Sequence, residues 1–173
     1  MATVAFLHAH PDDEAIFSGG TMAALAQGGH SVLLIVATGG ELGAAVRDAP
    51  LAEARRAELE SAARLLGVSS VHHLGYLDSG LAGDPANGAT GAFFAADPRI
   101  AAARVADILG DAGADTLVVY DDHGIYGHPD HVQGHRVGLA AADLATVQHR
   151  YEMTVDREYL HFVETHLVEE AAL

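Results

Sequence analysis

The stretch SVLLIVA, residues 31–37, decides the fold class of this chain. Every residue after Ser31 is apolar, and such short continuous runs are typical of strands that are covered on both faces, as in a parallel sheet between two layers of helices. The stretch TVAFLHA, residues 3–9, has the same character and follows directly on the start of the chain. We therefore expect two buried strands in the first forty residues.

Further strands and helices alternate along the rest of the chain. SVHHLGY and DTLVVYD resemble short strands, and apolar residues recur at helical spacing in the segments between them. Gly67 ends one of these helices, and Asp97 with Pro98 is suited to begin another. The expected helices cover residues 13–27, 51–66, 97–113 and a segment that begins near Pro129.

This alternation predicts an α/β fold with a Rossmann-like, open, mostly parallel sheet, right-handed crossovers and helices on both faces. A short C-terminal strand–helix extension follows, in which the strand begins near Arg150. Leu160, Val163, Leu167 and Ala171 mark its helix. The length of 173 residues suits a single domain over residues 1–173, and the sequence contains no internal repeat or linker.

Composition restricts the class of partner and the compartment. The net charge of −15 argues against binding to nucleic acid or to an anionic membrane. Cysteine is absent, so neither disulfides nor thiolate chemistry is available. We see no targeting segment and no apolar run long enough to cross a bilayer, which predicts a soluble, cytoplasmic protein.

The stretch HAHPDDE, residues 8–14, places three acidic residues beside a histidine, where the carboxylates repel one another unless a cation lies among them. A second motif, GHPDH, follows the strand DTLVVYD, and both motifs are expected at the carboxyl ends of the strands, where α/β sheets bind ligands. Two histidines and one carboxylate form a common ligand set for catalytic zinc. His10, Asp13 and His131 are the candidate ligands, and Asp12 would be free to accept a proton from a metal-activated water.

Simpler explanations exist for each motif alone. Acidic residues and a proline are common in the first turn of a helix, and the later histidines could be solvated residues beside a turn. Neither explanation accounts for both motifs. The roles of His8, His123 and His135 stay open, although His135 lies one helical turn after His131.

The two motifs together resemble the LmbE-like, or PIG-L, family of zinc-dependent N-deacetylases. TGGELG, RRAELESAARLLGV and GYLDSGLAG also match the family pattern, and the resemblance runs over nearly all of residues 2–143. It implies one LmbE-like deacetylase domain that resembles the N-acetylglucosaminyl deacetylases of mycothiol and bacillithiol synthesis. The part from about residue 147 is shorter than is usual for the family.

The resemblance also implies roles for single residues. His10, Asp13 and His131 resemble the metal ligands. Asp12 resembles the general base. His128 resembles the group that stabilises the oxyanion and protonates the leaving amine, and Asp130 the residue that orients His128. Tyr126 resembles a group that polarises the carbonyl.

Two further positions match those at which family members contact the substrate, Arg55 and Asp78. Their simpler readings are a charged helix face for Arg55 and turn chemistry for Asp78. Three other acids, Glu14, Glu41 and Asp121, are expected to support ligands or to order loops.

The expected function is hydrolysis of the N-acetyl group of a small N-acetylglucosaminyl-type or glycoside substrate, with Zn2+ or another divalent metal such as Fe2+ as cofactor. The alternatives are a metal-binding family member without catalysis and an amidase for another small conjugate. A dinucleotide enzyme is disfavoured because the chain lacks a G-x-G-x-x-G motif after its first strand. The short C-terminal part predicts exposed apolar surface, which a second copy would cover in a homo-oligomer.

Overall fold

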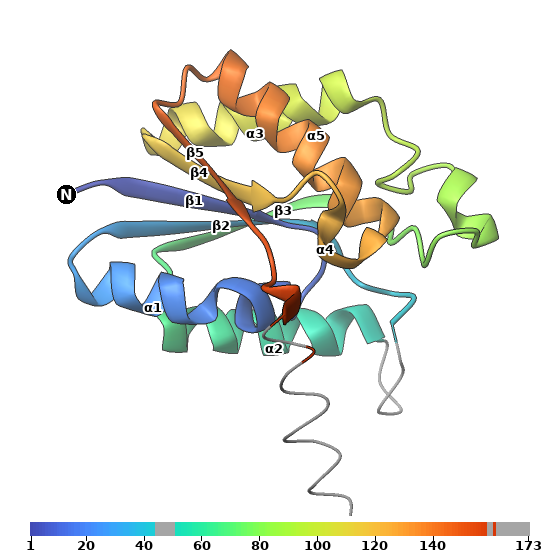
Figure 1. The fold of residues 1–173 in the computed structure, drawn as a ribbon, viewed down its shortest axis with the longest axis horizontal. Helices are drawn as coiled ribbons and strands as arrows, with labels where there is room; N and C mark the ends of the chain where they lie inside the picture. Colours follow the sequence, from blue (N-terminus) through green and yellow to red (C-terminus); the bar gives the residue numbers. More distant parts are fainter. Residues whose placement is uncertain (44–50, 159–160, 162–173) are drawn as a thin grey trace, which may run out of the picture.

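The computed structural model describes residues 1–43, 51–158 and 161. Five strands form one sheet in the order β3-β2-β1-β4-β5, and every described pairing is parallel. The expected α/β fold is therefore confirmed, with a sheet that is entirely rather than mostly parallel (Figure 1). The strands are β1 (Thr3–His8), β2 (Ser31–Thr38), β3 (Ser70–Tyr76), β4 (Thr116–Tyr120) and β5 (His149–Met153).

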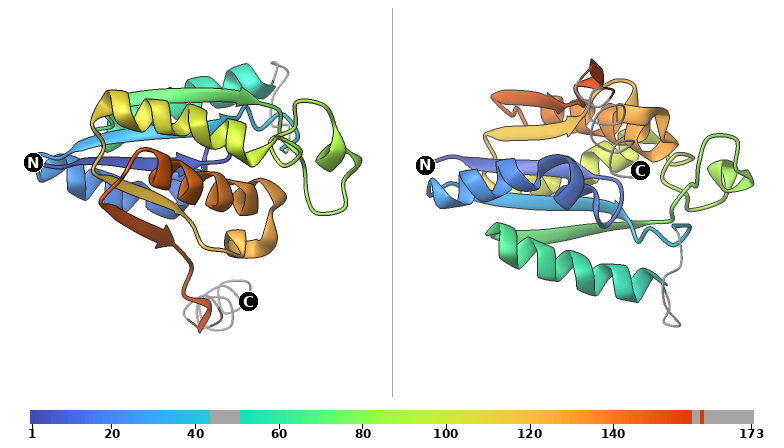
Figure 2. Two further views of the ribbon diagram at one scale, coloured as in Figure 1. Left: turned by 90° about the horizontal axis from the view of Figure 1, so that it is seen from above. Right: turned by 60° about the horizontal axis from the view of Figure 1, so that its bottom comes forward.

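Helices cover both faces of the sheet. α1 (Gly19–Gln27) and α2 (Leu51–Leu66) lie on one face, and α3 (Pro98–Ala112) and α5 (Pro129–Leu144) lie on the other (Figure 1). Seen from above, α3 and α5 run side by side across the sheet (Figure 2, left). A short helix, α4 (Gly124–Gly127), connects β4 to α5.

The buried side chains of the central strands alternate between the two helical layers. In β1, Ala5 and Leu7 belong to the core beneath α3 and α5, whereas Val4 and Phe6 belong to the core against α1 and α2. The stretch SVLLIVA divides in the same way, because successive residues of a strand point to opposite faces. Its continuous apolar character therefore reflects two separate cores rather than one.

The expected helix starts and stops are largely confirmed. The Asp97 carboxylate accepts the N–H of Arg99 at the start of α3, and α2 ends one residue before Gly67. The first helix differs from expectation, because a π-helical turn (Glu14–Ser18) precedes α1 and Asp12 has a φ of +105°. The backbone is thus distorted where the first motif leaves β1.

The strand order reverses between β1 and β4, so the chain segments after these two strands meet at one edge of the sheet. The C-terminal strand is present as β5, whereas the expected helix around Leu160, Val163, Leu167 and Ala171 falls outside the described residues. No helix in the described parts of the chain has the length and apolar character needed to span a membrane.

Candidate metal centre and active site

The two motifs meet in a cavity of about 420 Å³ at the carboxyl ends of β1 and β4. The first motif follows β1 and the second begins α5, as the strand order predicts. Seven of the nine residues singled out from the sequence line the cavity: His10, Asp12, Asp13, Arg55, Asp78, Tyr126 and His128. The other two, Asp130 and His131, are fully buried.

Three buried side chains present metal-binding atoms to one another. His10 Nδ1 lies 3.4 Å from Asp13 Oδ2, and His131 Nε2 lies 3.5 Å from Asp13 Oδ1. The ring centres of the two histidines are 5.3 Å apart. His10, Asp13 and His131 thus lie together, although they come from two segments more than a hundred residues apart in the chain.

The hydrogen bonds of His131 indicate that a positive ion fits here. Its Nδ1 lies 3.3 Å from the carbonyl oxygen of Gly124, and donation to that oxygen puts the only proton of a neutral ring on Nδ1. Nε2 then carries a lone pair, and it is a buried side-chain atom without a hydrogen-bond partner in the described structure. A lone pair buried against a carboxylate is costly unless a cation bridges the two groups.

The other proposed histidine ligand is oriented by Asp130. His10 Nε2 lies 3.2 Å from Asp130 Oδ2, and this carboxylate also accepts hydrogen bonds from the backbone N–H and the hydroxyl of Ser79 at 2.9 and 2.5 Å. A carboxylate behind a histidine fixes the ring and leaves its other nitrogen for the metal. The sequence predicted that Asp130 would orient His128. In the structure the Asp130 carboxylate bonds His10 and Ser79, and it is the backbone N–H of Asp130 that bonds His128 Nδ1.

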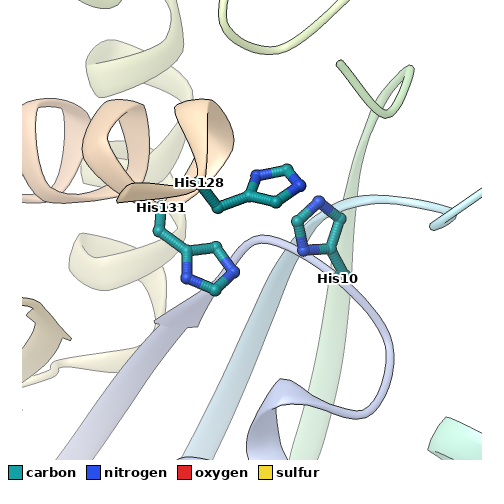
Figure 3. Close-up of side chains that lie close together, drawn as sticks. All are labelled: His10, His128 and His131. Atoms are coloured by element: carbon teal, nitrogen blue, oxygen red, sulfur yellow. The ribbon is translucent and has the colours of Figure 1, made fainter. Parts of the chain in front are cut away.

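His128 joins the cluster from the start of α5, and the three histidine rings point toward one another (Figure 3). One nitrogen from each of His10, His128 and His131 lies within 4.8 Å of the others, so His128 is an alternative third ligand. However, His128 Nδ1 accepts the N–H of Asp130 at 3.2 Å, which places the proton of a neutral ring on Nε2. His128 is therefore better suited to donate a hydrogen bond, whereas Asp13 offers a free carboxylate oxygen.

The protonation of His128 differs from the imidazolium expected of a proton donor. Burial lowers its pKa to about 4, and the nearby rings of His10 and His131 act in the same direction. In the absence of a metal the ring is neutral at pH 7. A neutral ring can still stabilise an oxyanion through a hydrogen bond from Nε2.

Asp12 occupies a strained position at the mouth of the cavity. Its positive φ is unusual for a residue with a side chain, and such strain is common at functional sites. The carboxylate of Glu14 accepts its N–H at 3.0 Å. Partial burial and the charge of Asp13 raise the pKa of Asp12, whereas the neighbouring Arg55 lowers it.

Arg55 reaches from α2 into the loops around the site instead of lying on an exposed helix face. Its guanidinium donates hydrogen bonds to the carbonyl oxygens of Gly40 and Pro11 at 2.6 and 2.8 Å, and to Asp12 Oδ2 at 2.6 Å. A Cβ atom at Gly40 or Gly43 would overlap Arg55 Nη1. The glycines of the TGGELG segment therefore make room for this side chain.

The remaining predicted residues lie at the rim. Asp78 accepts hydrogen bonds from the N–H groups of Gly80 and Leu42, as a turn residue does, and it also lines the cavity. Both readings of this residue therefore apply. Tyr126 is 60% exposed, with its ring centre 5.1 Å from that of His131. Burial and the surrounding carboxylates raise the pKa of Tyr126 to about 12, so its hydroxyl keeps its proton.

The expected loop-ordering acids each accept a backbone N–H: Glu14 from Asp12, Glu41 from Asp78, and Asp121 from Ile125. Ile125 also has a positive φ of 64°, so Asp121 helps to hold a strained turn in front of Tyr126.

Sequence reasoning missed two contributors and left three histidines open. Tyr120 and Ser79 contact the cluster directly; a polar aromatic residue at the end of β4, on the same rim as the motifs, was the available indication for Tyr120. His8 is buried and lies 2.8 Å from the Ser18 hydroxyl, whereas His135 bonds the backbone of Tyr120 and His123 is exposed. In the described structure these three histidines, like Asp13, do not belong to a set of three metal-binding atoms within 4.8 Å of one another.

Two curated relatives are similar over most of the chain. The chain is 46% identical over 153 residues to 1D-myo-inositol 2-acetamido-2-deoxy-alpha-D-glucopyranoside deacetylase 1 of Catenulispora acidiphila, covering 80% of this chain and 47% of that protein. It is 41% identical over 156 residues to the deacetylase of the same description from Thermomonospora curvata, covering 82% and 52%. The chain thus spans about half the length of these relatives.

A solved structure and a family model agree with these matches. The N,N'-diacetylchitobiose deacetylase from Pyrococcus horikoshii superimposes with a TM-score of 0.62 at 29% identity, over 82% of this chain and 48% of that one. The family model described as "PIG-L: GlcNAc-PI de-N-acetylase" matches residues 5–142, a range that begins within β1, extends past β4 and contains both histidine motifs. On the strength of this match across most of its length, the chain belongs to the PIG-L family.

Proposed function

We propose that this chain hydrolyses the N-acetyl group of a small N-acetylglucosaminyl-type substrate, using a divalent metal held by His10, Asp13 and His131. The observation that carries the proposal is the buried pair of His131 Nε2 and Asp13 Oδ1, 3.5 Å apart, beside a cavity that the Asp12 carboxylate also lines. The relatives are named as deacetylases of acetamido-glucosyl and chitobiose compounds, which supports the same substrate class.

Zinc is the proposed ion, because nitrogen and oxygen ligands in this number are those of hydrolytic zinc sites. Ferrous iron accepts the same donors and is the alternative. Such an ion, when bound, would polarise the amide carbonyl and lower the pKa of a water to about 7.

The chain's own residues would handle the protons. Asp12 accepts a proton from the attacking water as the C–O bond forms, and it then gives this proton to the nitrogen as the C–N bond breaks, which releases acetate and an amine. His128 Nε2–H and the Tyr126 hydroxyl are the donors available to the oxyanion that develops on the carbonyl oxygen. Both side chains line the cavity, and both keep their protons at neutral pH.

The test is acetate release from 1D-myo-inositol 2-acetamido-2-deoxy-alpha-D-glucopyranoside and from N-acetylglucosamine by the zinc-loaded protein. Replacing Asp12 by Asn should lower kcat about 10²- to 10⁴-fold while zinc binding is retained. Asp122→Asn is the matched control, because Asp122 is an exposed acid outside the cavity. Zinc binding without turnover on any acetamide would instead identify a metal-binding protein without this activity.

A further inference from the structure

Tyr120 ends β4 beneath the metal centre and is completely buried. We propose that Tyr120 is a positioning residue that holds Asp13 and His131 in ligand geometry before the ion arrives. This inference rests on the proposed ligand set and adds a residue to which neither sequence motif points.

The hydroxyl of Tyr120 fixes one oxygen of Asp13. It donates to Asp13 Oδ2 at 2.6 Å and accepts the N–H of Ala9 at 2.7 Å. The N–H of His10 donates to the same Oδ2 at 2.8 Å. Two short hydrogen bonds therefore hold Oδ2, and this leaves Oδ1 directed at His131 Nε2.

The ring of Tyr120 fixes the second ligand. It stacks on the imidazole of His131, with ring centres 4.1 Å apart and an interplanar angle of 8°. The carbonyl oxygen of Gly124 holds the same imidazole through Nδ1. Stacking and this hydrogen bond together therefore fix the orientation of the His131 ring. A single side chain thus contacts a carboxylate ligand and an imidazole ligand at once.

The position of the Tyr120 ring depends on how α5 packs against it. A Cβ atom at Gly134 would lie 3.1 and 3.2 Å from two carbons of the Tyr120 ring, closer than almost all real contacts. Glycine at this helix position therefore lets the ring lie flat beneath the ligands. His8 Nδ1 also lies 3.4 Å from the Tyr120 hydroxyl.

The first test is the zinc affinity of Tyr120→Phe, measured on metal-free protein by competition with a chromophoric chelator. Supporting groups behind metal ligands change affinity about 10- to 100-fold, and we expect a loss of this size. The matched control is Thr38→Val, because the Thr38 hydroxyl is also buried and also bonds the backbone of Ala9, at its carbonyl oxygen, 3.0 Å away. Among the described residues the Thr38 hydroxyl bonds Ala9 and Gly40, and neither Asp13 nor His131, so its variant should bind zinc within about twofold of the wild type while losing thermal stability.

A second variant keeps the hydroxyl and moves the ring. Gly134→Ala should shift Tyr120 by a few tenths of an ångström, weaken zinc binding and alter the visible spectrum of the Co2+-loaded protein. If Tyr120→Phe does not fold, this variant decides the question. Zinc affinity that stays within twofold of the wild type in the folded variants would overturn the proposal, as would an equal loss in Thr38→Val or a wild type that binds no zinc. Weaker zinc binding in Tyr120→Phe supports the role of Tyr120 whether or not the wild type releases acetate. The role of Tyr120 and the proposed deacetylase activity can therefore fail independently.

Discussion

Arg55 and Asp12 form an ion pair with 2.6 Å between Nη2 and Oδ2, although 43 positions separate them in the chain. Helix α2 thereby reaches the residue that we propose as the general base. The Arg55 side chain is 16% exposed and also bonds Pro11 and Gly40, whereas the Asp12 side chain is 55% exposed, so Arg55 holds this pair from its buried side.

Replacing Arg55 by Ala should therefore lower kcat/KM about 10- to 100-fold through misplacement of Asp12. It should also move the acidic limb of the pH profile of kcat/KM to higher pH, because the cation that lowers the pKa of Asp12 has gone. Arg56→Ala is the control, since Arg56 lies on the same helix and pairs with the exposed side chain of Glu60 instead of Asp12. A pH profile that does not move in Arg55→Ala would show that Arg55 does not act on the base.

Replacing Gly40 by Ala should displace the Arg55 side chain and so disturb its contact with Asp12. The new Cβ would overlap Arg55, and the φ of +65° adds about 1–2 kcal/mol of backbone strain. Gly75→Ala is a close control, because Gly75 has a φ of +72° but no atom within 4 Å of its Cβ position. Urea unfolding should show a larger loss for Gly40→Ala, by about 1 kcal/mol or more, and only this variant should lose activity. Equal losses would mean that Arg55 moves aside freely.

The apparent affinity for zinc should rise with pH. Burial alone would lower the pKa of His10, but hydrogen bonds with Asp13, Asp130 and Asp78 raise it well above its usual range. At neutral pH the metal-free protein therefore carries a proton on His10 that the ion must displace. Burial alone would raise the pKa of Asp13, but the interactions with the His10 and His131 rings hold it well below its usual range, so Asp13 contributes no change above pH 6.

Calorimetric titration in buffers of different ionisation enthalpy measures this proton release directly. We expect close to one proton per ion at pH 7 and an affinity that increases between about pH 6 and pH 8. An affinity that is flat over this range, with no proton released, would contradict the protonation state inferred for His10.

Replacing Gly138 by Ala tests the packing of α5 on the sheet. A Cβ atom there would overlap Val119 in β4, and overpacking of this kind costs about 1–3 kcal/mol. Gly110→Ala in α3 is the matched variant, since its Cβ position has no atom within 4 Å and alanine favours a helix by up to about 1 kcal/mol. Thermal unfolding should therefore show a decrease for the first variant and no decrease for the second.

The fold and the meeting of the two motifs could be predicted because both depend on pattern and topology. Strands covered on two faces must be apolar throughout, and parallel strands bring their carboxyl ends to one edge. These two rules are enough to predict that His10, Asp13 and His131 lie close together.

The support around these residues could not be predicted in the same way. The direction of the Asp130 carboxylate depends on a side-chain rotamer at the start of α5, and the strained backbone of Asp12 depends on the π-helical turn that follows it. Tyr120 follows three apolar residues in its strand, so its hydroxyl gave only weak evidence of a partner. These features arise from local geometry that residue spacing does not encode.

The adjacency of β1 and β4 also has a kinetic consequence. Asp13 and Tyr120 are 107 positions apart, so the two sides of the metal centre meet only after a long loop has closed, and such non-local pairing is slow. A chain emerging from the ribosome would expose its first motif long before α5 is made. Ion binding would then come at the end of folding and stabilise the completed fold. The rate of unfolding should therefore fall when zinc is present, while the rate of folding changes little.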